Sequence, residues 1–403
     1  MPITAIPSTS PVHAVLPLLV ALVILPGCNH RTEQQVSPDS SDAPRAPERA
    51  ARPQEPDEPL PYIVEDVLFA NTEADVRLAG TLTLPHTQDP HPAVVLISGS
   101  GPQDRDETIF GHKPFLVLAD HLTRNGIAVL RYDDRGVASS TGNFGIATLS
   151  DFADDARAAL NFLRSRSDID AKRIGLLGHS SGGITGPMAA LREPGKVAYL
   201  VLLAAPAMPG EQVLYQQDAA QAHAAGVDEA AIERSRKRKE EIFSVIKTEP
   251  DLASAAVKLK RTMRAMDLTP EERAEIDAEG VDIDALIASQ IRQLNTRWYR
   301  SFLSYDPAGA LERLEVPVLA LIGERDLQVL ASEHLHRIEA ALKRGPCPRH
   351  VVREMPKLNH LFQTAETGLP SEYAQIEETF APAALQFISD WIRSEVGFER
   401  MRD

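Results

Sequence analysis

Residues 173–183 constrain the fold of this chain most, because a short apolar run there leads directly into the pattern Gly-x-Ser-x-Gly. The apolar run predicts a buried strand, and the residues after Ser180 are compatible with a helix. The turn that joins this strand to this helix must be tight. It therefore strains the backbone of the serine, and side chains at Gly178 or Gly182 would collide with their neighbours. A Gly/Ser turn without chemistry would carry the same five letters, but the strand before it and the helix after it make Ser180 a candidate nucleophile.

Short apolar runs alternate with amphipathic segments along the rest of the chain. Residues 62–69 and 76–84 predict an antiparallel hairpin. Buried strands are expected at 93–97, 127–132, 173–177, 199–203, 316–322 and 350–355, and helices at 114–124, 151–164, 182–191, 333–342 and 384–394. This alternation is typical of an α/β fold with a mostly parallel, doubly wound sheet, in which ligands bind beyond the carboxyl ends of the strands.

The alternation stops between Pro206 and Pro307, where the chain becomes rich in Ala, Glu, Lys, Arg and Gln. Residues 232–246 and 252–266 have helical periodicity and no strand signal. We therefore expect a catalytic domain built from residues 62–206 and 307–403, with a helical cap inserted at 207–306. The charge run at 233–241 is interpreted as a solvated helix face.

The N-terminus has the features of an export signal. Residues 14–25 are apolar and too few to span a membrane, and Leu-Pro-Gly-Cys at 25–28 resembles the lipobox of bacterial lipoproteins. No Lys or Arg precedes the apolar run, so an ordinary buried segment with an incidental Cys28 is the alternative. Residues 29–61 are polar and proline-rich and predict a disordered linker. We expect an exported protein, periplasmic or held at the cell envelope by a lipid on Cys28.

A serine hydroxyl is a weak nucleophile until a histidine accepts its proton, and a carboxylate must orient that histidine. The buried strand at 316–322 is followed by a loop that carries Asp326, the expected acid, with Glu324 as the competing candidate. The last strand is followed by His360, the expected base. On this type of fold the nucleophile comes first along the chain, then the acid and then the histidine, and Ser180, Asp326 and His360 follow that order.

Two other histidines lie near these elements. His350 stands at the beginning of the last strand, which is the wrong end of the sheet for the site. His179 precedes the serine inside the turn, and we expect it to pack near the site rather than to accept a proton.

Backbone amides are expected to stabilise the oxyanion of the tetrahedral intermediate. One is that of Ser181, at the start of the helix after the serine. The other is expected in the glycine-rich loop after the strand that ends at Ile97, where Ser100 is favoured and Gly101 is the alternative.

The net charge and the spacing of motifs argue against several other classes of function. The formal net charge of -15 at pH 7 disfavours nucleic acid and anionic lipid as partners. The loop at 98–102 lacks the spacing of a P-loop or a dinucleotide fingerprint, and no metal-ligand spacing occurs. We therefore expect neither a cofactor nor a metal, and a small-molecule substrate.

The chain resembles the serine aminopeptidase-like, S33-type branch of the α/β-hydrolase superfamily, which contains many bacterial esterases. The resemblance rests on the stretches SGSGPQDRD (98–106), RYDDRG (131–136), GHSSGG (178–183) and LNHLFQ (358–363). It implies an α/β-hydrolase fold, carboxylesterase activity on small acyl esters and a cap that shapes the acyl pocket. Ser181 replaces the glutamate usual after the nucleophile, and Ala138 replaces a glycine usual in the Asp-x-Arg-Gly loop.

Two other functions remain open at this point. A peptidase or an acyltransferase would use the same three residues, because fold and triad do not fix the acceptor. An envelope lipoprotein that binds a partner without catalysis would use the fold and the linker alone.

Overall fold

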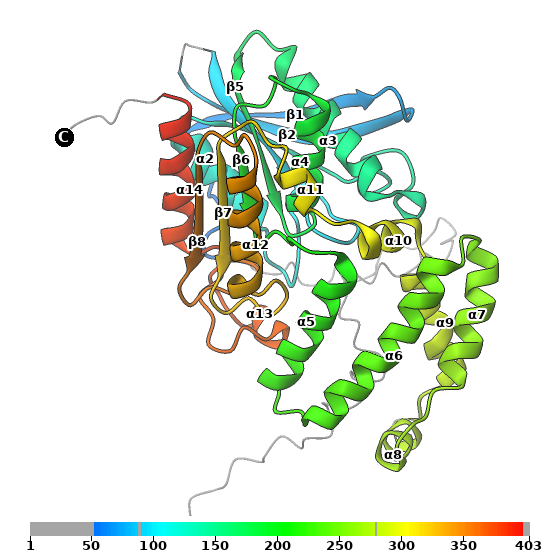
Figure 1. The fold of residues 1–403 in the computed structure, drawn as a ribbon. Helices are drawn as coiled ribbons and strands as arrows, with labels where there is room; N and C mark the ends of the chain where they lie inside the picture. Colours follow the sequence, from blue (N-terminus) through cyan, green and yellow to red (C-terminus); the bar gives the residue numbers. More distant parts are fainter. Residues whose placement is uncertain (1–51, 88–89, 279, 398–403) are drawn as a thin grey trace, which may run out of the picture. The chain divides into compact units, whose positions relative to one another are not determined.

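The computed structural model describes residues 52–87, 90–278 and 280–397. These residues divide into two compact units, one made of 52–208 and 306–397 and the other of 209–305 (Figure 1). The predicted signal segment at 1–28 and most of the predicted linker lie outside the described residues.

The first unit is built on an eight-stranded sheet with the order β1-β2-β4-β3-β5-β6-β7-β8. Its strands are β1 (Tyr62–Asn71), β2 (Val76–Pro85), β3 (His91–Ile97), β4 (Ala128–Tyr132), β5 (Ile169–His179), β6 (Leu200–Leu203), β7 (Val318–Gly323) and β8 (His350–Met355). The β1–β2 and β2–β4 pairs are antiparallel, and the other pairs are parallel. The predicted mostly parallel sheet with an antiparallel hairpin at one edge is therefore confirmed.

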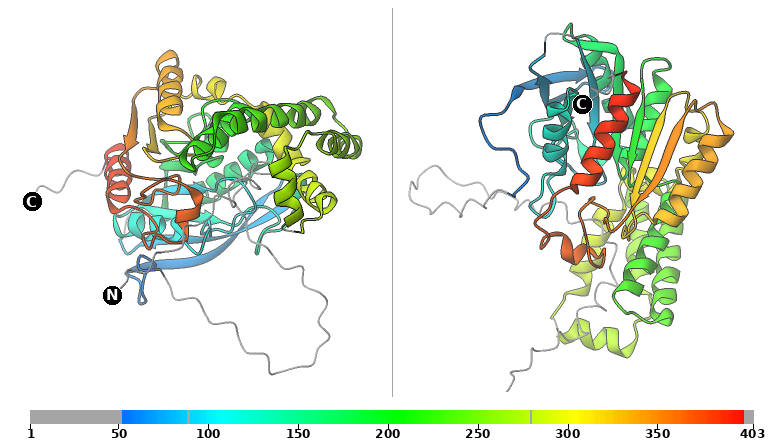
Figure 2. Two further views of the ribbon diagram at one scale, coloured as in Figure 1. Left: turned by 90° about the horizontal axis from the view of Figure 1, so that it is seen from below. Right: turned by 90° about the vertical axis from the view of Figure 1, so that its left-hand side faces the viewer.

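Helices cover both faces of this sheet. They are α2 (Pro114–Arg124), η2 (Phe144–Ile146), α3 (Leu149–Arg164), α4 (Gly182–Arg192), α11 (Ala308–Leu311), α12 (Ala331–Arg344), α13 (Pro370–Tyr373) and α14 (Pro382–Glu395). The right panel of Figure 2 looks onto the face that α2 and α14 cover.

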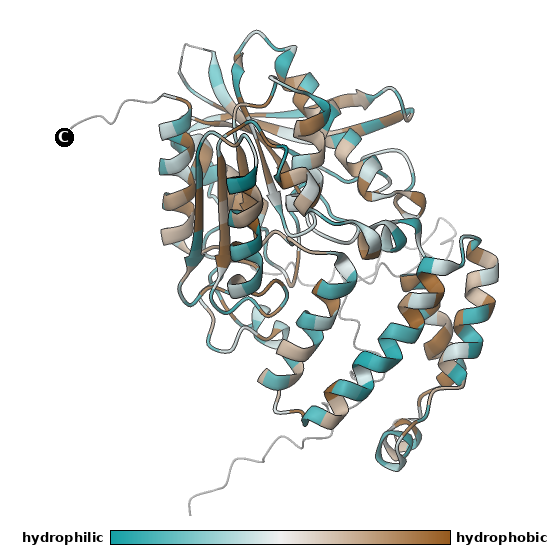
Figure 3. Ribbon diagram, viewed as in Figure 1, coloured by the Kyte–Doolittle hydropathy of each residue, from teal (hydrophilic) through white to brown (hydrophobic). Residues whose placement is uncertain are grey.

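The core lies in two layers, one on each face of the sheet. In β3, Val94 and Leu96 pack with α2 and α14, whereas Val95 and Ile97 pack with α3, α4 and α12. Alternate residues of a strand point to opposite faces, so a strand covered on both faces is apolar at nearly every position. Figure 3 shows the resulting hydrophobic strands.

The strand that leads to the candidate nucleophile is longer than its sequence predicts. The expected strand covered 173–177, but β5 spans Ile169–His179 and pairs with β3 from His91 onward. Its first half carries Asp170, Lys172 and Arg173, which hide the strand signal. Arg173 pairs with Asp170 at 2.7 Å at the surface, so these charges remain solvated within the strand.

Residues 52–60 differ from the expected disordered linker, because polar side chains attach them to the first unit. Arg52 donates to the carbonyl oxygens of Ile376 (3.0 Å) and Ala374 (2.9 Å). Gln54 donates to the carbonyl of Phe380 at 2.8 Å. The stretch contains few apolar residues, and its contacts are mostly hydrogen bonds to distant backbone, which composition does not reveal.

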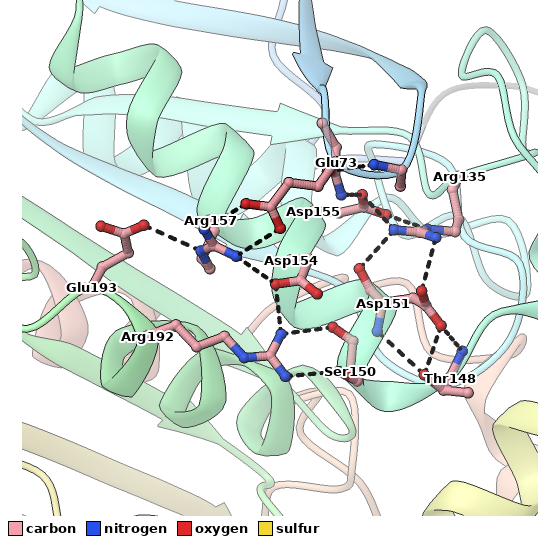
Figure 4. A network of polar contacts seen from close by, with 12 residues as sticks. Glu73, Arg135, Thr148, Ser150, Asp151, Asp154, Asp155, Arg157, Arg192 and Glu193 are labelled. Carbon is pink, nitrogen blue, oxygen red and sulfur yellow. Dashed lines mark hydrogen bonds and ion pairs between the residues drawn. The ribbon is translucent and has the colours of Figure 1, made fainter.

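A network of charges joins the β1–β2 turn to α3 and the end of α4 (Figure 4). At its centre, the buried guanidinium of Arg135 binds both carboxylate oxygens of Asp155, at 2.6 and 2.8 Å. Arg157 contacts Glu73, Asp154 and Glu193. Because each charge has a partner, the cost of removing these groups from water is offset.

The second unit is helical. Its helices are α5 (Gly210–Ala224), α6 (Glu229–Thr248), α7 (Leu252–Arg264), α8 (Pro270–Ala278), α9 (Ile283–Leu294) and α10 (Arg297–Ser304). Phe243 of α6 is fully buried between Tyr215 and Tyr299. The charge run on α6 is mostly exposed, although Lys239 is buried and pairs with Asp218.

No helix among the described residues has both the length and the apolar character needed to cross a membrane.

Candidate active site

The backbone of Ser180 is strained at the junction of β5 and α4. Its φ is 52°, in the left-handed region that costs a non-glycine residue about 1–2 kcal/mol. A Cβ at Gly178 would lie 2.1 Å from the carbonyl oxygen of Gly182, and one at Gly182 would lie 2.2 Å from that of Ile97. Both positions therefore require glycine for the close approach of the helix to the strands, and the turn presents Ser180 at the carboxyl end of the sheet.

Ser180, His360 and Asp326 form one hydrogen-bonded chain. Nε2 of His360 lies 3.2 Å from Oγ of Ser180, and Nδ1 lies 2.8 Å from Oδ2 of Asp326. His360 and Asp326 are each only 1% exposed. A carboxylate oxygen accepts, so Nδ1 donates to Asp326, and Nε2 faces the hydroxyl of Ser180. The three residues come from the ends of β5, β7 and β8.

Backbone amides fix the carboxylate of Asp326. Its Oδ1 accepts from the amides of Gln328 and Val329, each at 2.8 Å. Glu324, the competing acid, is exposed and accepts from the amide of Lys357 at 2.8 Å. Glu324 thus supports the chain just before the histidine loop and makes no contact with His360 among the described hydrogen bonds.

The loop that carries His360 is held by an internal amide pair. Oδ1 of Asn359 accepts from the backbone amides of Leu361 (3.0 Å) and Gln363 (2.9 Å). Nδ2 of Asn359 donates to Oε1 of Gln363 at 2.9 Å. Phe362 has a φ of 61°, so the loop turns sharply immediately after the histidine. These contacts limit the movement of the imidazole. His350 begins β8, at the opposite end of the strand.

The expected oxyanion loop lies beside the serine. A Cβ on Gly99 would come within 3.3 Å of that of Ser180, so the loop backbone directly contacts the nucleophile. The amide of Gly99 is already bound to Glu107, at 2.6 Å. Among the described hydrogen bonds none uses the amide of Ser100 or that of Ser181, which leaves both able to donate to a ligand.

Asp134 clamps the two ends of this loop. One carboxylate oxygen accepts from the hydroxyl of Ser98 at 2.8 Å and the other from the amide of Gln103 at 3.0 Å. Burial raises the pKa of Asp134 to about 8, against the opposing effect of these hydrogen bonds. The neighbouring Asp133 binds Arg105 in a two-pronged pair at 3.0 and 2.8 Å. Gly101, the alternative oxyanion donor, has a φ of 96° and forms the turn between these anchors.

Three side chains that support the site were not singled out from the sequence as site residues: Glu107, Asp134 and Gln363. Asp134 and Gln363 lie in the stretches that carry the family resemblance, and Glu107 follows one of them directly. Nothing local in the sequence signals their roles, because each also contacts a group that is remote along the chain: Glu107 contacts His179, Asp134 contacts Ser98, and Gln363 contacts His112. His179 packs beside the site, as expected, with its ring centroid 5.0 Å from that of His360.

Comparison with known proteins places the chain in a family. The sequence profile of the family described as serine aminopeptidase, S33, matches residues 113–364, which is more than half of the chain. The chain belongs to the serine aminopeptidase S33 family. The family predicted from the four sequence stretches is thereby confirmed, and so is a serine hydrolase.

Individual relatives of this S33 member extend the comparison. It is 29% identical over 317 residues to Esterase EstD of Thermotoga maritima. That match covers 78% of this chain and 65% of the relative, slightly under two thirds of its length. Among solved structures, the α/β hydrolase GrgF from Penicillium sp. matches with a TM-score of 0.50 at 15% identity, over 83% of this chain and all of that one. DcsB, solved with a substrate analogue, matches equally well. These likenesses confirm the α/β-hydrolase fold.

Proposed function

We propose that this protein is a carboxylesterase that hydrolyses small acyl esters through Ser180, His360 and Asp326. The observation that supports this most strongly is the unbroken hydrogen-bonded chain from Asp326 through His360 to Ser180, which ends at a strained serine. The 29% identity to an esterase over most of the chain favours an ester substrate.

In this mechanism Oγ of Ser180 attacks the ester carbonyl while Nε2 of His360 accepts the hydroxyl proton. The imidazolium that forms is stabilised by Asp326 and then donates its proton to the alkoxide that leaves. Water attacks the acyl-enzyme next, with His360 again as the base, and releases the carboxylic acid and the free serine. Because both steps use the same base, the position of its ring determines both rates.

The tetrahedral intermediate places a negative charge on the former carbonyl oxygen, beside Gly99 and the start of α4. We assign its stabilisation to the backbone amides of Ser181 and Ser100. Both amides lack a partner among the described hydrogen bonds, and the Ser181 amide is at the positive end of a helix. An oxyanion donor of this kind contributes about 3 kcal/mol to transition-state stabilisation.

Peptide hydrolysis is the second candidate, because the matching family is described as serine aminopeptidases. Acyl transfer to an alcohol would use the same acyl-enzyme. These reactions differ in the leaving group or in the acceptor, and the three residues above serve all of them.

A substrate panel distinguishes the candidates. Purified protein is assayed with nitrophenyl esters from acetyl to lauroyl, with aminoacyl nitroanilides, and with esters in the presence of added alcohols. We expect kcat/KM to be highest for short esters and to vanish in Ser180→Ala, while Ser165→Ala, at the exposed end of α3, retains wild-type rates. Higher kcat/KM for the nitroanilides would support the peptidase. Absence of turnover and of fluorophosphonate labelling in the folded wild type would support a binding protein without catalysis.

A further inference from the structure

His179 and Glu107 form a buried pair that the mechanism above does not use. Nδ1 of His179 lies 2.9 Å from Oε1 of Glu107, and the two side chains are 8% and 4% exposed. Glu107 reaches this position from a backbone with a φ of 53°, which costs a non-glycine residue about 1–2 kcal/mol. Strain of this kind, next to the strained Ser180, points to a functional constraint on the side chain.

Both ring nitrogens of His179 face acceptors. Nε2 lies 3.0 Å from the backbone carbonyl oxygen of His360, and a carbonyl oxygen only accepts. Oε1 of Glu107 accepts from the amide of Gly99, so it faces Nδ1 as an acceptor as well. His179 therefore donates from both nitrogens, as an imidazolium. Burial acts to lower the pKa of His179, but the charge and hydrogen bond of Glu107 outweigh it and raise that pKa.

This protonation state excludes His179 as an alternative base. Neither of its nitrogens has a lone pair free to accept the proton of Ser180, although the residue is adjacent to the serine. Beyond the pair itself, the charge of Asp326 also favours the imidazolium of His179.

The pair connects the two halves of the site. A continuous path runs from the amide of Gly99 to Glu107, on to His179, and from there to the backbone of His360. The first end lies in the oxyanion loop after β3, and the last lies in the histidine loop after β8. These loops belong to segments more than 250 residues apart, so the path sets the distance between the oxyanion donors and the base.

We propose that Glu107 and His179 act together as a positioning pair that fixes the position of the oxyanion loop relative to the catalytic histidine. This inference rests on the proposed function. In the transition state the oxyanion and the imidazolium of His360 form simultaneously, so an error in the spacing of their loops weakens both. A displacement of about 1 Å at such a site costs about 100-fold in rate.

The test compares Glu107→Gln, His179→Gln and the double variant with the wild type. Glutamine at 107 keeps the shape and removes the charge, and glutamine at 179 cannot bind both acceptors as the imidazolium does. Fluorophosphonate titration gives the concentration of active sites, so kcat refers to folded enzyme only. Asp155→Asn is the matched control, because it weakens a buried ion pair with Arg135 in the same unit and has no described hydrogen bond to Ser180, His360 or Asp326.

We expect each single variant to lose about 10- to 100-fold in kcat per titrated site, with KM changed less than about twofold. The affinity for a trifluoromethyl ketone, whose hemiketal oxygen occupies the oxyanion site, falls by the same factor. The double variant loses about as much as the worse single one, because either change breaks the same path. The control lowers the melting temperature and leaves kcat per site unchanged.

The proposal is overturned if both single variants keep kcat per site within about twofold of wild type while their stability falls as in the control. A measurement on the wild type stands independently of how the variants fold. Nitrogen-15 NMR of labelled histidine is expected to show one imidazole whose pKa lies above that of an ordinary histidine, and its absence contradicts the proposal. A wild type that neither turns over esters nor titrates would instead contradict the proposed function.

Discussion

The carboxylate of Asp326 binds Nδ1 of His360 at 2.8 Å across 34 residues of sequence. The second oxygen of the same carboxylate is fixed by two backbone amides of its own loop. The carboxylate of Asp326 is therefore held by the backbone of its own loop as well as by His360. Two loops from different strands thus bring the ring of His360 within hydrogen-bond distance of Ser180.

Replacement of that acid gives the first prediction. In Asp326→Asn the amide group favours the wrong tautomer of His360, so we expect kcat to fall by about 10⁴-fold. Glu324→Gln is the matched control, because Glu324 lies on the same loop and its side chain accepts from the Lys357 amide, with no hydrogen bond to His360 among the described residues. Steady-state kinetics with a nitrophenyl ester measure both variants. A larger loss in Glu324→Gln than in Asp326→Asn would reverse the assignment of the acid.

The second prediction concerns Ala138, which stands where relatives are expected to carry glycine. Its φ is 44° and its side chain is exposed, so no packing of the side chain offsets the backbone strain. We expect Ala138→Gly to raise the free energy of unfolding by about 1 kcal/mol. Ala340→Gly, within α12, should lower it by about the same amount. Denaturant titration measures both, and equal signs for the two variants would refute the argument.

The third prediction is a pH dependence of stability. Burial raises the pKa of Asp134 to about 8, whereas an unfolded aspartate titrates near 4. Between these values the folded state binds the additional proton, so this group's contribution to stability is present at low pH and is lost as pH rises towards 8. Asp134→Asn does not titrate. Its melting temperature relative to wild type should therefore increase from pH 5 to pH 9.

Asp133→Asn is the control for that experiment. Burial acts to raise the pKa of Asp133, but its hydrogen bonds to Arg105 prevail and lower it. The contribution of Asp133 to the free energy of unfolding is thus present above pH 4 and is lost only in acid. The difference in melting temperature between this variant and wild type should stay constant from pH 5 to pH 9. A constant difference for Asp134→Asn as well would show that its carboxyl is ionised throughout.

The fourth prediction concerns the N-terminus, which lies outside the described residues. We propose that Cys28 is acylated after cleavage of the preceding segment, which would hold the enzyme at the bacterial cell envelope. Cells fed radiolabelled palmitate should label the wild-type protein and not Cys28→Ala. Cys347→Ala, which changes the only other cysteine, should label normally. Equal labelling of wild type and Cys28→Ala would show that Cys28 does not carry the lipid.

The positions of the chemical groups follow from local sequence to different degrees. Ser180 is predictable because its turn demands two glycines at fixed spacing, and α2 begins and ends at the predicted residues because Pro114 starts it and a Gly follows soon after its end. Asp326 and His360 are candidates because each follows a buried strand at the carboxyl edge, and the structure brings both together with Ser180. The local signals in these cases are steric or periodic.

Contacts across long sequence separations are not predictable in this way. Glu107 looks like a surface acid in a loop of Asp, Arg and Thr, yet it is 3% exposed because it meets the histidine of another strand. Arg52 and Gln54 lie in a proline-rich stretch, and their partners are carbonyl oxygens more than 300 residues away. Backbone acceptors have no sequence signature, so only coordinates reveal them.

The central claim is that Ser180 becomes covalently acylated, and mass spectrometry tests it most directly. The protein is treated with a fluorophosphonate, digested, and its peptides are sequenced with and without prior incubation with a slowly hydrolysed ester. We predict a single modified site, at Ser180, that is protected by the ester and absent in Ser180→Ala. Modification of a different residue with Ser180 unmodified, or an intact wild type that never reacts, would contradict the account.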